Sequence, residues 1–140
     1  MTVRRLIDTN VIVRHLVQDH ERHSSQASRL FAACDRGDLT LVVLPAVLAE
    51  CVFVLESFYE HPRPQIAHVL KSLIASPGIE LSDLPIQLDA LSRYGRTQIH
   101  IVDCVLAATA ACERVPVATF DRDFKTFRDV TVDLSLGNSG

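Results

Sequence analysis

Four acidic residues stand in apolar parts of this sequence, where a carboxylate is costly to bury. Asp8 and Asp121 each follow a short apolar run, Asp103 begins a nearly continuous apolar stretch, and Glu50 has apolar neighbours on both sides. An ionised carboxylate removed from water needs a partner, and these segments hold too few Lys and Arg residues to neutralise all four. Converging carboxylates repel one another unless a cation lies among them, and oxygen-only ligands suit Mg²⁺ or Mn²⁺.

Each acid also has a structural explanation when it is taken alone. Asp8 suits a helix N-cap, which is worth about 1 kcal/mol, and Asp103 suits the positive end of a helix dipole. Glu50 suits a solvated helix face, and Asp121 suits a turn. A shared site is favoured over four separate explanations because residues at the carboxyl ends of parallel strands converge on one crevice.

The elements that must position these acids alternate between strand and helix patterns. This alternation is typical of an α/β fold built on a mostly parallel sheet. The predicted strands are Val3–Ile7, Leu39–Leu44, Ile79–Leu81, Val115–Thr119 and Val130–Val132, and the predicted helices are Val11–Val17, Glu21–Asp35, Pro45–Tyr59, Gln65–Ala75, Pro85–Arg93 and Asp103–Arg114, followed by a loop and short helix over Asp121–Phe127.

Composition limits the class of protein. The chain has 140 residues, with 14 Lys and Arg against 17 Asp and Glu and a net charge of −3, which argues against a polybasic nucleic-acid binder. We expect one domain over residues 1–133 and a polar, flexible tail over 134–140. None of the cysteines forms a CxxC pair and no apolar run is long enough to span a membrane, so we expect a cytoplasmic protein with no membrane segment.

The chain resembles the PIN-domain nucleases, and among them the VapC-type toxins of toxin–antitoxin systems. The resemblance runs from about Val3 to Val132. It implies a three-layer α/β/α sandwich with a central, mostly parallel sheet, and a Mg²⁺- or Mn²⁺-dependent endoribonuclease. It also implies a cognate antitoxin and a homodimer. The segments that carry it are Asp8-Thr9-Asn10, Glu50 in its apolar helix, Asp103-Cys104-Val105-Leu106-Ala107-Ala108 and Thr119-Phe120-Asp121-Arg122-Asp123-Phe124.

The resemblance also implies roles for individual residues. The acids that match the catalytic, metal-binding quartet of the family are Asp8, Glu50, Asp103 and Asp121. Asn10 and Thr119 match positions that support those carboxylates, and Asp123 is a candidate outer ligand. Four arginines near the motifs are candidates for RNA contacts, although a solvated surface role is the alternative for each: Arg14, Arg93, Arg96 and Arg122.

Other classes of protein share part of this pattern of acids. A phosphoryl-transfer enzyme of the haloacid-dehalogenase type also places an aspartate after the first strand, but it needs a second aspartate two residues later, where this chain has Asn10. A response-regulator receiver lacks its paired acids and late lysine here. The stronger alternative is a PIN-like scaffold that binds RNA or a partner without cleaving, although such a scaffold need not retain all four acids.

Overall fold

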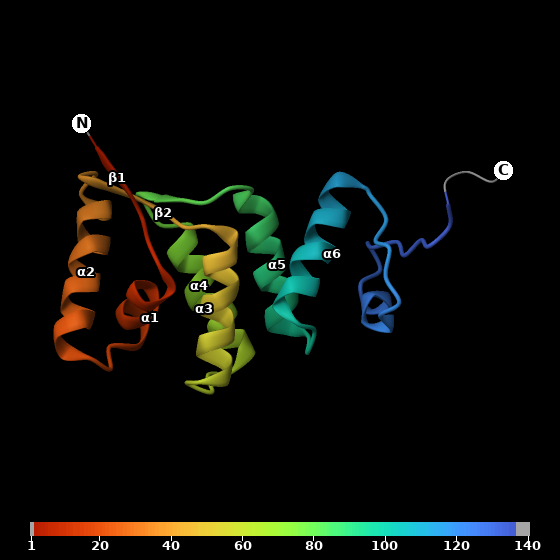
Figure 1. Ribbon diagram of the computed structural model, residues 1–140, viewed down its shortest axis with the longest axis horizontal. Helices are drawn as coiled ribbons and strands as arrows, with labels where there is room; N and C mark the ends of the chain where they lie inside the picture. The colour runs from red at the N-terminus through yellow and green to blue at the C-terminus, as the bar shows by residue number, and fades with distance from the viewer. Residues whose placement is uncertain (1, 137–140) are drawn as a thin grey trace.

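The computed structural model describes residues 2–136, in which each of the three strands is followed by two helices (Figure 1). The predicted helices all form, and their ends shift by a few residues. Pro45 begins one helix at a position that needs no backbone N–H donor. The elements are β1 (Val3–Leu6), α1 (Thr9–Val17), α2 (Glu21–Asp35), β2 (Leu39–Val42), α3 (Pro45–Ser57), α4 (Arg63–Ile74), β3 (Ile79–Glu80), α5 (Leu84–Arg96), α6 (Ile101–Glu113) and the 3₁₀ helix η1 (Arg122–Thr126).

The sheet contains three parallel strands in the order β1-β2-β3. Val3 pairs with Leu39, and Leu41 pairs with Ile79. Leu39 and Leu41 are buried in β2, whereas all four residues of β1 are exposed. The α/β class and the parallel sheet predicted from the sequence are confirmed, and β1 lies at the edge of that sheet.

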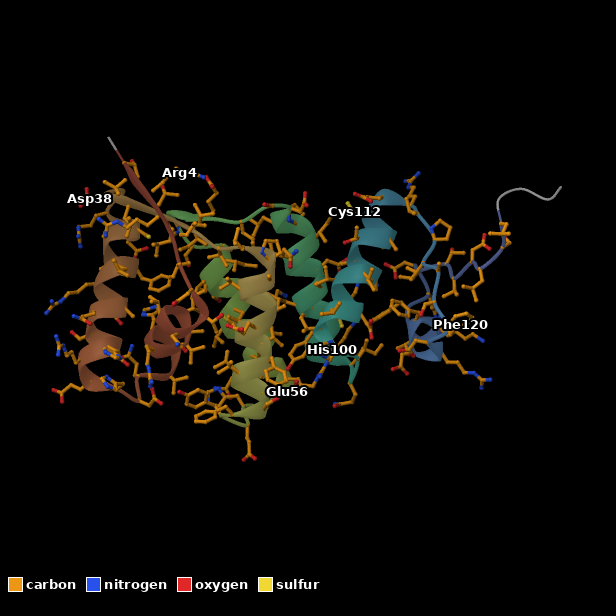
Figure 2. All side chains as sticks on the ribbon, in the orientation of Figure 1. Arg4, Asp38, Glu56, His100, Cys112 and Phe120 are labelled. Carbon is orange, nitrogen blue, oxygen red and sulfur yellow. The ribbon has the colours of Figure 1, made fainter. Side chains whose placement is uncertain are left out.

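The C-terminal segment, defined here as residues 115–136, corrects one prediction. Strands were predicted over Val115–Thr119 and Val130–Val132, yet within the described residues these stretches form only one parallel bridge, Val117 to Val132, outside the sheet. The prediction of two further sheet strands is therefore wrong for this structure. These stretches lie too far from β1 to pair with it. Figure 2 shows Arg4 on β1 and Phe120 in the C-terminal segment well separated along the longest axis of the molecule.

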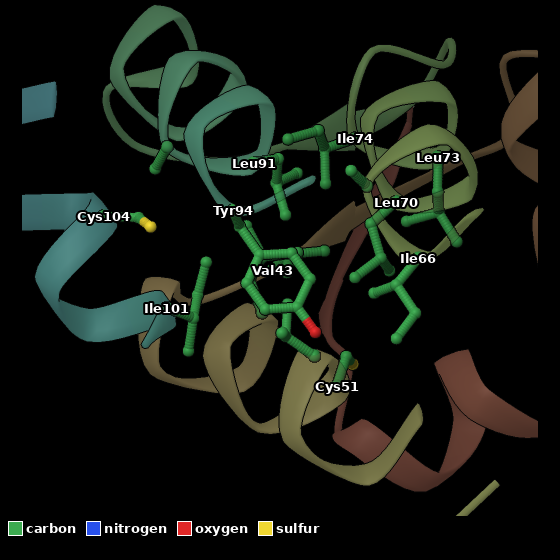
Figure 3. Close-up of a cluster of buried hydrophobic side chains, with 14 of the residues drawn as sticks. Val43, Cys51, Ile66, Leu70, Leu73, Ile74, Leu91, Tyr94, Ile101 and Cys104 are labelled. Carbon is green, nitrogen blue, oxygen red and sulfur yellow. The ribbon is translucent and has the colours of Figure 1, made fainter. Parts of the chain in front are cut away.

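A buried apolar cluster lies where α3, α4 and α5 meet the sheet and α6 (Figure 3). Ile66 and Leu70 from α4 pack there with Leu91 and Tyr94 from α5. Gly95 brings α5 very close to α4, because a Cβ atom at that position would lie 2.7 Å from the Cβ atom of Ala67. The two helices are thus held at a separation that only glycine allows.

Two further predictions concern the ends and surface of the chain. The predicted tail begins at residue 134, and residues 137–140 lie outside the part of the chain that the structure describes. Leu134 and Leu136 are exposed. Among the described residues, no helix combines the length and the apolar character needed to cross a lipid bilayer.

Candidate metal-binding site

Asp8 lies between the end of β1 and the start of α1. Its backbone is extended, and its Oδ1 atom accepts a hydrogen bond of 3.2 Å from the Val11 N–H group. The side chain is therefore an N-cap, as its structural explanation predicted. It is also exposed, so the cap leaves the Oδ2 atom accessible for a ligand.

Glu50 lies on an exposed face of α3. Ala46 and Phe53, one helical turn to either side, are also exposed, and Phe53 retains 58% of its accessible surface. The neighbouring Cys51 is buried, and burial raises the pKa of its thiol to about 12, with smaller contributions from the charges of Glu50 and Asp8. Helix α1, which Asp8 caps, packs against α3, which carries Glu50.

Asp121 lies in the C-terminal segment, where it caps η1. Its Oδ1 atom accepts a 2.8 Å hydrogen bond from the Asp123 N–H group, and the Asp121 N–H group donates to Thr119 Oγ1 at 3.0 Å. Thr119 therefore orients the backbone at Asp121, and the role predicted for it in supporting the carboxylates stays a prediction. The side chains of Asp121 and Asp123 are both exposed.

Asp103 is half-buried in the first turn of α6. The N-cap of this helix is His100, whose Nδ1 atom accepts from the Val102 N–H group at 3.2 Å. Burial raises the pKa of the adjacent Cys104 thiol to about 11, Arg63 and Arg93 oppose that rise, and Asp103 adds to it. The charges that act on this region come from α4, α5 and α6.

The four acids thus come from four different parts of the chain. Asp8 follows β1, Glu50 lies on α3, Asp103 lies in the first turn of α6, and Asp121 lies in the C-terminal segment. Across residues 2–136, no three His, Cys, Asp or Glu side chains lie close enough together to hold a metal ion. The donor types suit a hard divalent cation, but their arrangement within one chain does not, so the metal-binding role of these acids stays a prediction.

Two of the polar candidates line a hollow between α1 and α2. Asn10 and Arg14 border it together with His23 and Gln26. The Arg14 guanidinium donates to Asp19 at 2.9 Å. Asn10 is exposed and remains available to a ligand.

The remaining arginine candidates divide into exposed and buried residues. Arg96 and Arg122 are exposed, which suits contact with an anionic polymer. Arg93 is only 3% exposed, and its guanidinium donates to Asp89 and Asp129, which raises its pKa. The prediction that Arg93 contacts RNA is therefore wrong for this structure, because its donors are already bonded inside the protein.

Arg63 has a structural role that sequence reasoning did not identify. From α4 it donates to the carbonyl oxygens of Tyr94 and Ile99 and to Glu56, and its guanidinium lies 3.7 Å from the centre of the Tyr94 ring. It therefore ties α3 and α4 to α5 and to the connector that precedes α6. No local pattern marks it, whereas the i,i+4 spacing of Asp89 and Arg93 was a visible signal for the other ion pair.

Comparison with known proteins identifies a family and a similar solved structure. The PIN domain family matches residues 5–130. A solved structure from Mycobacterium tuberculosis, VapC20, described as a sarcin-ricin loop cleaving toxin, is 22% identical with a TM-score of 0.40, over 90% of this chain and 98% of that one. No curated protein sequence matches the chain significantly.

Proposed function

Because the chain belongs to the PIN-domain family, we propose that it is a divalent-metal-dependent endoribonuclease that hydrolyses RNA phosphodiester bonds. The observation that carries the proposal is that all four acids of the quartet are present within the matched region, with Asp8, Glu50 and Asp121 exposed and Asp103 half-buried. Mg²⁺ or Mn²⁺, when bound, supplies positive charge that activates water and offsets the charge of the phosphate.

The acids of this chain would then contribute mainly by holding their carboxylate oxygens in fixed orientations. The Asp8 and Asp121 carboxylates each commit one oxygen atom to a backbone N–H group, which orients the second oxygen. Thr119 holds the turn on which Asp121 sits. Such pre-orientation matters in phosphodiester hydrolysis because the protein contributes chiefly by placing charges around an in-line displacement.

The proposal extends to partners and to cellular role. The resemblance to VapC-type toxins supports RNA as the substrate, an antitoxin that inhibits the enzyme, and the cytoplasm as its compartment. The net charge of −3 gives the chain little general attraction for RNA. Divalent ions at the quartet would offset that deficit where phosphate must approach, and Arg96 and Arg122 are the accessible candidates for further contacts.

A scaffold that binds RNA or a partner without cleaving it is the second candidate. It is favoured by one observation: across residues 2–136, no three His, Cys, Asp or Glu side chains lie close enough together to hold a metal ion. The two candidates differ in whether the acids affect a chemical step or only binding.

The experiment is an RNA cleavage assay at varied Mg²⁺ and Mn²⁺ with EDTA as the metal-free control. We expect Asp8→Asn and Asp103→Asn to reduce cleavage at least about 100-fold while the far-UV spectrum and unfolding midpoint stay unchanged. The matched control is Asp38→Asn, an exposed aspartate paired with Arg36, which should cleave normally. Undiminished cleavage by Asp8→Asn, or in EDTA, would exclude the metal-dependent mechanism.

A further inference from the structure

Helices α1 and α2 lie side by side (Figure 1), and a hollow of about 440 Å³ opens between them. Pockets that hold small molecules have volumes of about 300–1,000 Å³, so this one is large enough for a ring system and its substituents. The residues that line it, which define the α1–α2 hollow, are Asn10, Val11, Arg14, His23, Gln26, Ala27 and Leu30.

The lining combines an apolar floor with a polar rim. Ala27 is buried and Val11 and Leu30 are half-buried, whereas Asn10 and Gln26 are exposed. The small side chain of Ala27 leaves space where the two helices pass each other. Among the described residues, those that line the hollow include no acid, so an anionic ligand meets no carboxylate there. A flat molecule with apolar faces and a polar edge matches such a lining.

A flat side chain borders the hollow at the start of α2. His23 stacks on His20, with ring centres 4.0 Å apart and an angle of 18° between the ring planes. The Nδ1 atom of His20 also accepts a 3.1 Å hydrogen bond from the His23 N–H group, which holds both residues at the helix start. Histidine rings are among the side chains on which unpaired RNA bases stack. The rim of the hollow therefore includes a stacking surface.

The amide groups of Gln26 and Asn10 can read the edge of a stacked base. Both side chains are exposed and line the hollow, so their amide groups are accessible to a ligand inside it. A side-chain amide presents a donor beside an acceptor. Adenine offers the complementary pair at N6 and N7, and Gln and Asn bind it through both atoms at once. The rim thus favours adenine among the bases.

Arg14 adds a positive charge that is fixed in place. Its Nη1 atom donates to Asp19 at 2.9 Å, and Asp19 accepts a 2.8 Å hydrogen bond from the Tyr59 hydroxyl group. These bonds tie α1 to the residues that follow α3. A guanidinium has five N–H donors, so Arg14 has donors beyond Nη1 with which to bind a phosphate oxygen.

The hollow adjoins Asp8. Asn10 follows Asp8 by two residues, and Cα atoms at that separation lie within about 7 Å of each other. The Oδ1 atom of Asp8 accepts from the Val11 N–H group at 3.2 Å, and the side chain of Val11 lines the hollow. A base in the hollow therefore belongs to a nucleotide beside the phosphate that approaches Asp8.

We propose that the α1–α2 hollow binds one unpaired base of the RNA, with adenine preferred, and thereby selects the position of cleavage. The role in cleavage rests on the proposed function, whereas the binding of a nucleotide does not. In this arrangement His23 stacks on the base, the Gln26 amide pairs with its edge, and Arg14 binds the phosphate. Sequence-specific recognition of RNA generally uses unpaired bases that are stacked on flat side chains and hydrogen-bonded at their edges.

Nucleotide binding tests the hollow without cleavage. The full chain in EDTA is titrated with adenosine 5′-monophosphate (AMP) and with ribose 5-phosphate, and NMR chemical shifts of the backbone amides are followed. We expect AMP to bind at least about 10-fold more tightly than ribose 5-phosphate and than the other three nucleoside monophosphates. Gln26→Ala and His23→Ala should each remove most of the advantage of AMP over ribose 5-phosphate. The matched control is Gln65→Ala, an exposed glutamine of α4, which should bind AMP as wild type does.

The other outcomes of the titration overturn the proposal. Equal binding of AMP and ribose 5-phosphate would show that the protein recognises only the phosphate. No binding of AMP would leave the apolar floor to a side chain of a protein partner. A different nucleotide bound more tightly than AMP would overturn the preference for adenine. These results hold whether or not the protein cleaves RNA.

Cleavage of a randomised RNA tests whether the hollow sets the specificity. Sequencing of the cut ends gives the base preference at each position around the cut. We expect wild type to prefer adenine at one position beside the cut, and Gln26→Ala to cleave with that preference reduced about 10-fold. An unchanged preference in Gln26→Ala beside an active wild type would refute base recognition by the hollow. An inactive wild type that still binds AMP through Gln26 would refute only the nuclease function.

Discussion

The junction of α4, α5 and α6 and the outer edges of the molecule differ in how their polar groups are satisfied. At the junction, Arg63 and Arg93 are both buried or nearly so; Arg63 bonds to α3, α5 and the connector before α6, and Arg93 bonds to Asp89 on its own helix and to Asp129 in the C-terminal segment. At the edges, Leu6 and Phe120 are exposed, and within residues 2–136 β1 has a strand partner on one side only. The difference separates two kinds of region: the junction holds the chain together, whereas the exposed side chains at the edges contribute little to that.

This contrast predicts how strongly substitutions in each of the two regions change the free energy of unfolding. Removing a junction contact leaves buried groups unsatisfied, which is costly. Removing an edge side chain exposes nothing new in the single chain, so its stability changes little.

The largest expected effect is at Arg63. In Arg63→Leu the carbonyl groups of Tyr94 and Ile99 lose their donor, and we expect the free energy of unfolding to fall by about 3 kcal/mol. Urea unfolding followed by circular dichroism measures it. Arg29→Leu, at an exposed position of α2, is the control and should stay within about 0.5 kcal/mol of wild type. Equal losses in the free energy of unfolding for the two substitutions would show that the buried bonds of Arg63 do not stabilise the fold.

Gly95→Ala comes next. The new Cβ atom would lie 2.7 Å from that of Ala67, so α5 must move away from α4, and we expect a loss of about 2 kcal/mol despite the better helix propensity of alanine. Adding Ala67→Gly removes the collision and should recover part of the loss in the same urea titration. A single variant as stable as wild type would contradict the close packing of these helices.

The junction of α1 with α2 should respond to pH, with a smaller effect. His15 stacks on Phe31 with ring centres 4.2 Å apart and contacts Ser28, and burial lowers its pKa below the usual 6.5. The unfolded chain then binds a proton as pH falls through about 6.5 that the folded chain does not bind, so this contribution to stability is lost towards acid. We expect thermal unfolding midpoints to fall more steeply below about pH 6.5 in wild type than in His15→Gln. Parallel pH profiles would contradict this expectation.

The smallest effect on chain stability is expected at the β1 edge. Leu6→Ser should change the free energy of unfolding at high dilution by less than about 0.5 kcal/mol, because the leucine is already 71% exposed. Urea unfolding followed by circular dichroism measures the change. A loss of stability as large as that of Arg63→Leu would show that Leu6 is part of the packed interior.

Much of the fold was predictable because helices are encoded locally. The apolar residues of α4 recur at helical spacing, and Ile66, Leu70 and Leu73 are buried as that spacing predicts. The strand at Val115–Thr119 was predicted from its β-branched and apolar residues, but a strand requires a neighbour, and the identity of that neighbour depends on long-range packing.

The candidate site was predictable in the same limited sense. The local positions of Asp8 and Asp121 at the ends of extended stretches were correct, as was the N-cap at Asp8, whereas Asp121 was expected in a turn and caps η1 instead. The spacing of residues along the chain does not determine which extended stretches pair with one another. The convergence of the acids could therefore not be predicted from that spacing. Arg93 shows the same limit, because the acid that completes its burial, Asp129, lies far along the chain.

The capping bonds of Asp8 and Asp121 have a consequence for conformational entropy. Each carboxylate is held by a backbone N–H group two or three residues later, so its rotamer is restricted when the chain folds. A free aspartate would lose that freedom only on binding a ligand, and the loss would weaken affinity. Asparagine can keep the cap oxygen, whereas alanine cannot. Replacing Asp8 by asparagine therefore tests the loss of the charge alone, and replacing it by alanine tests the loss of both the charge and the capping bond.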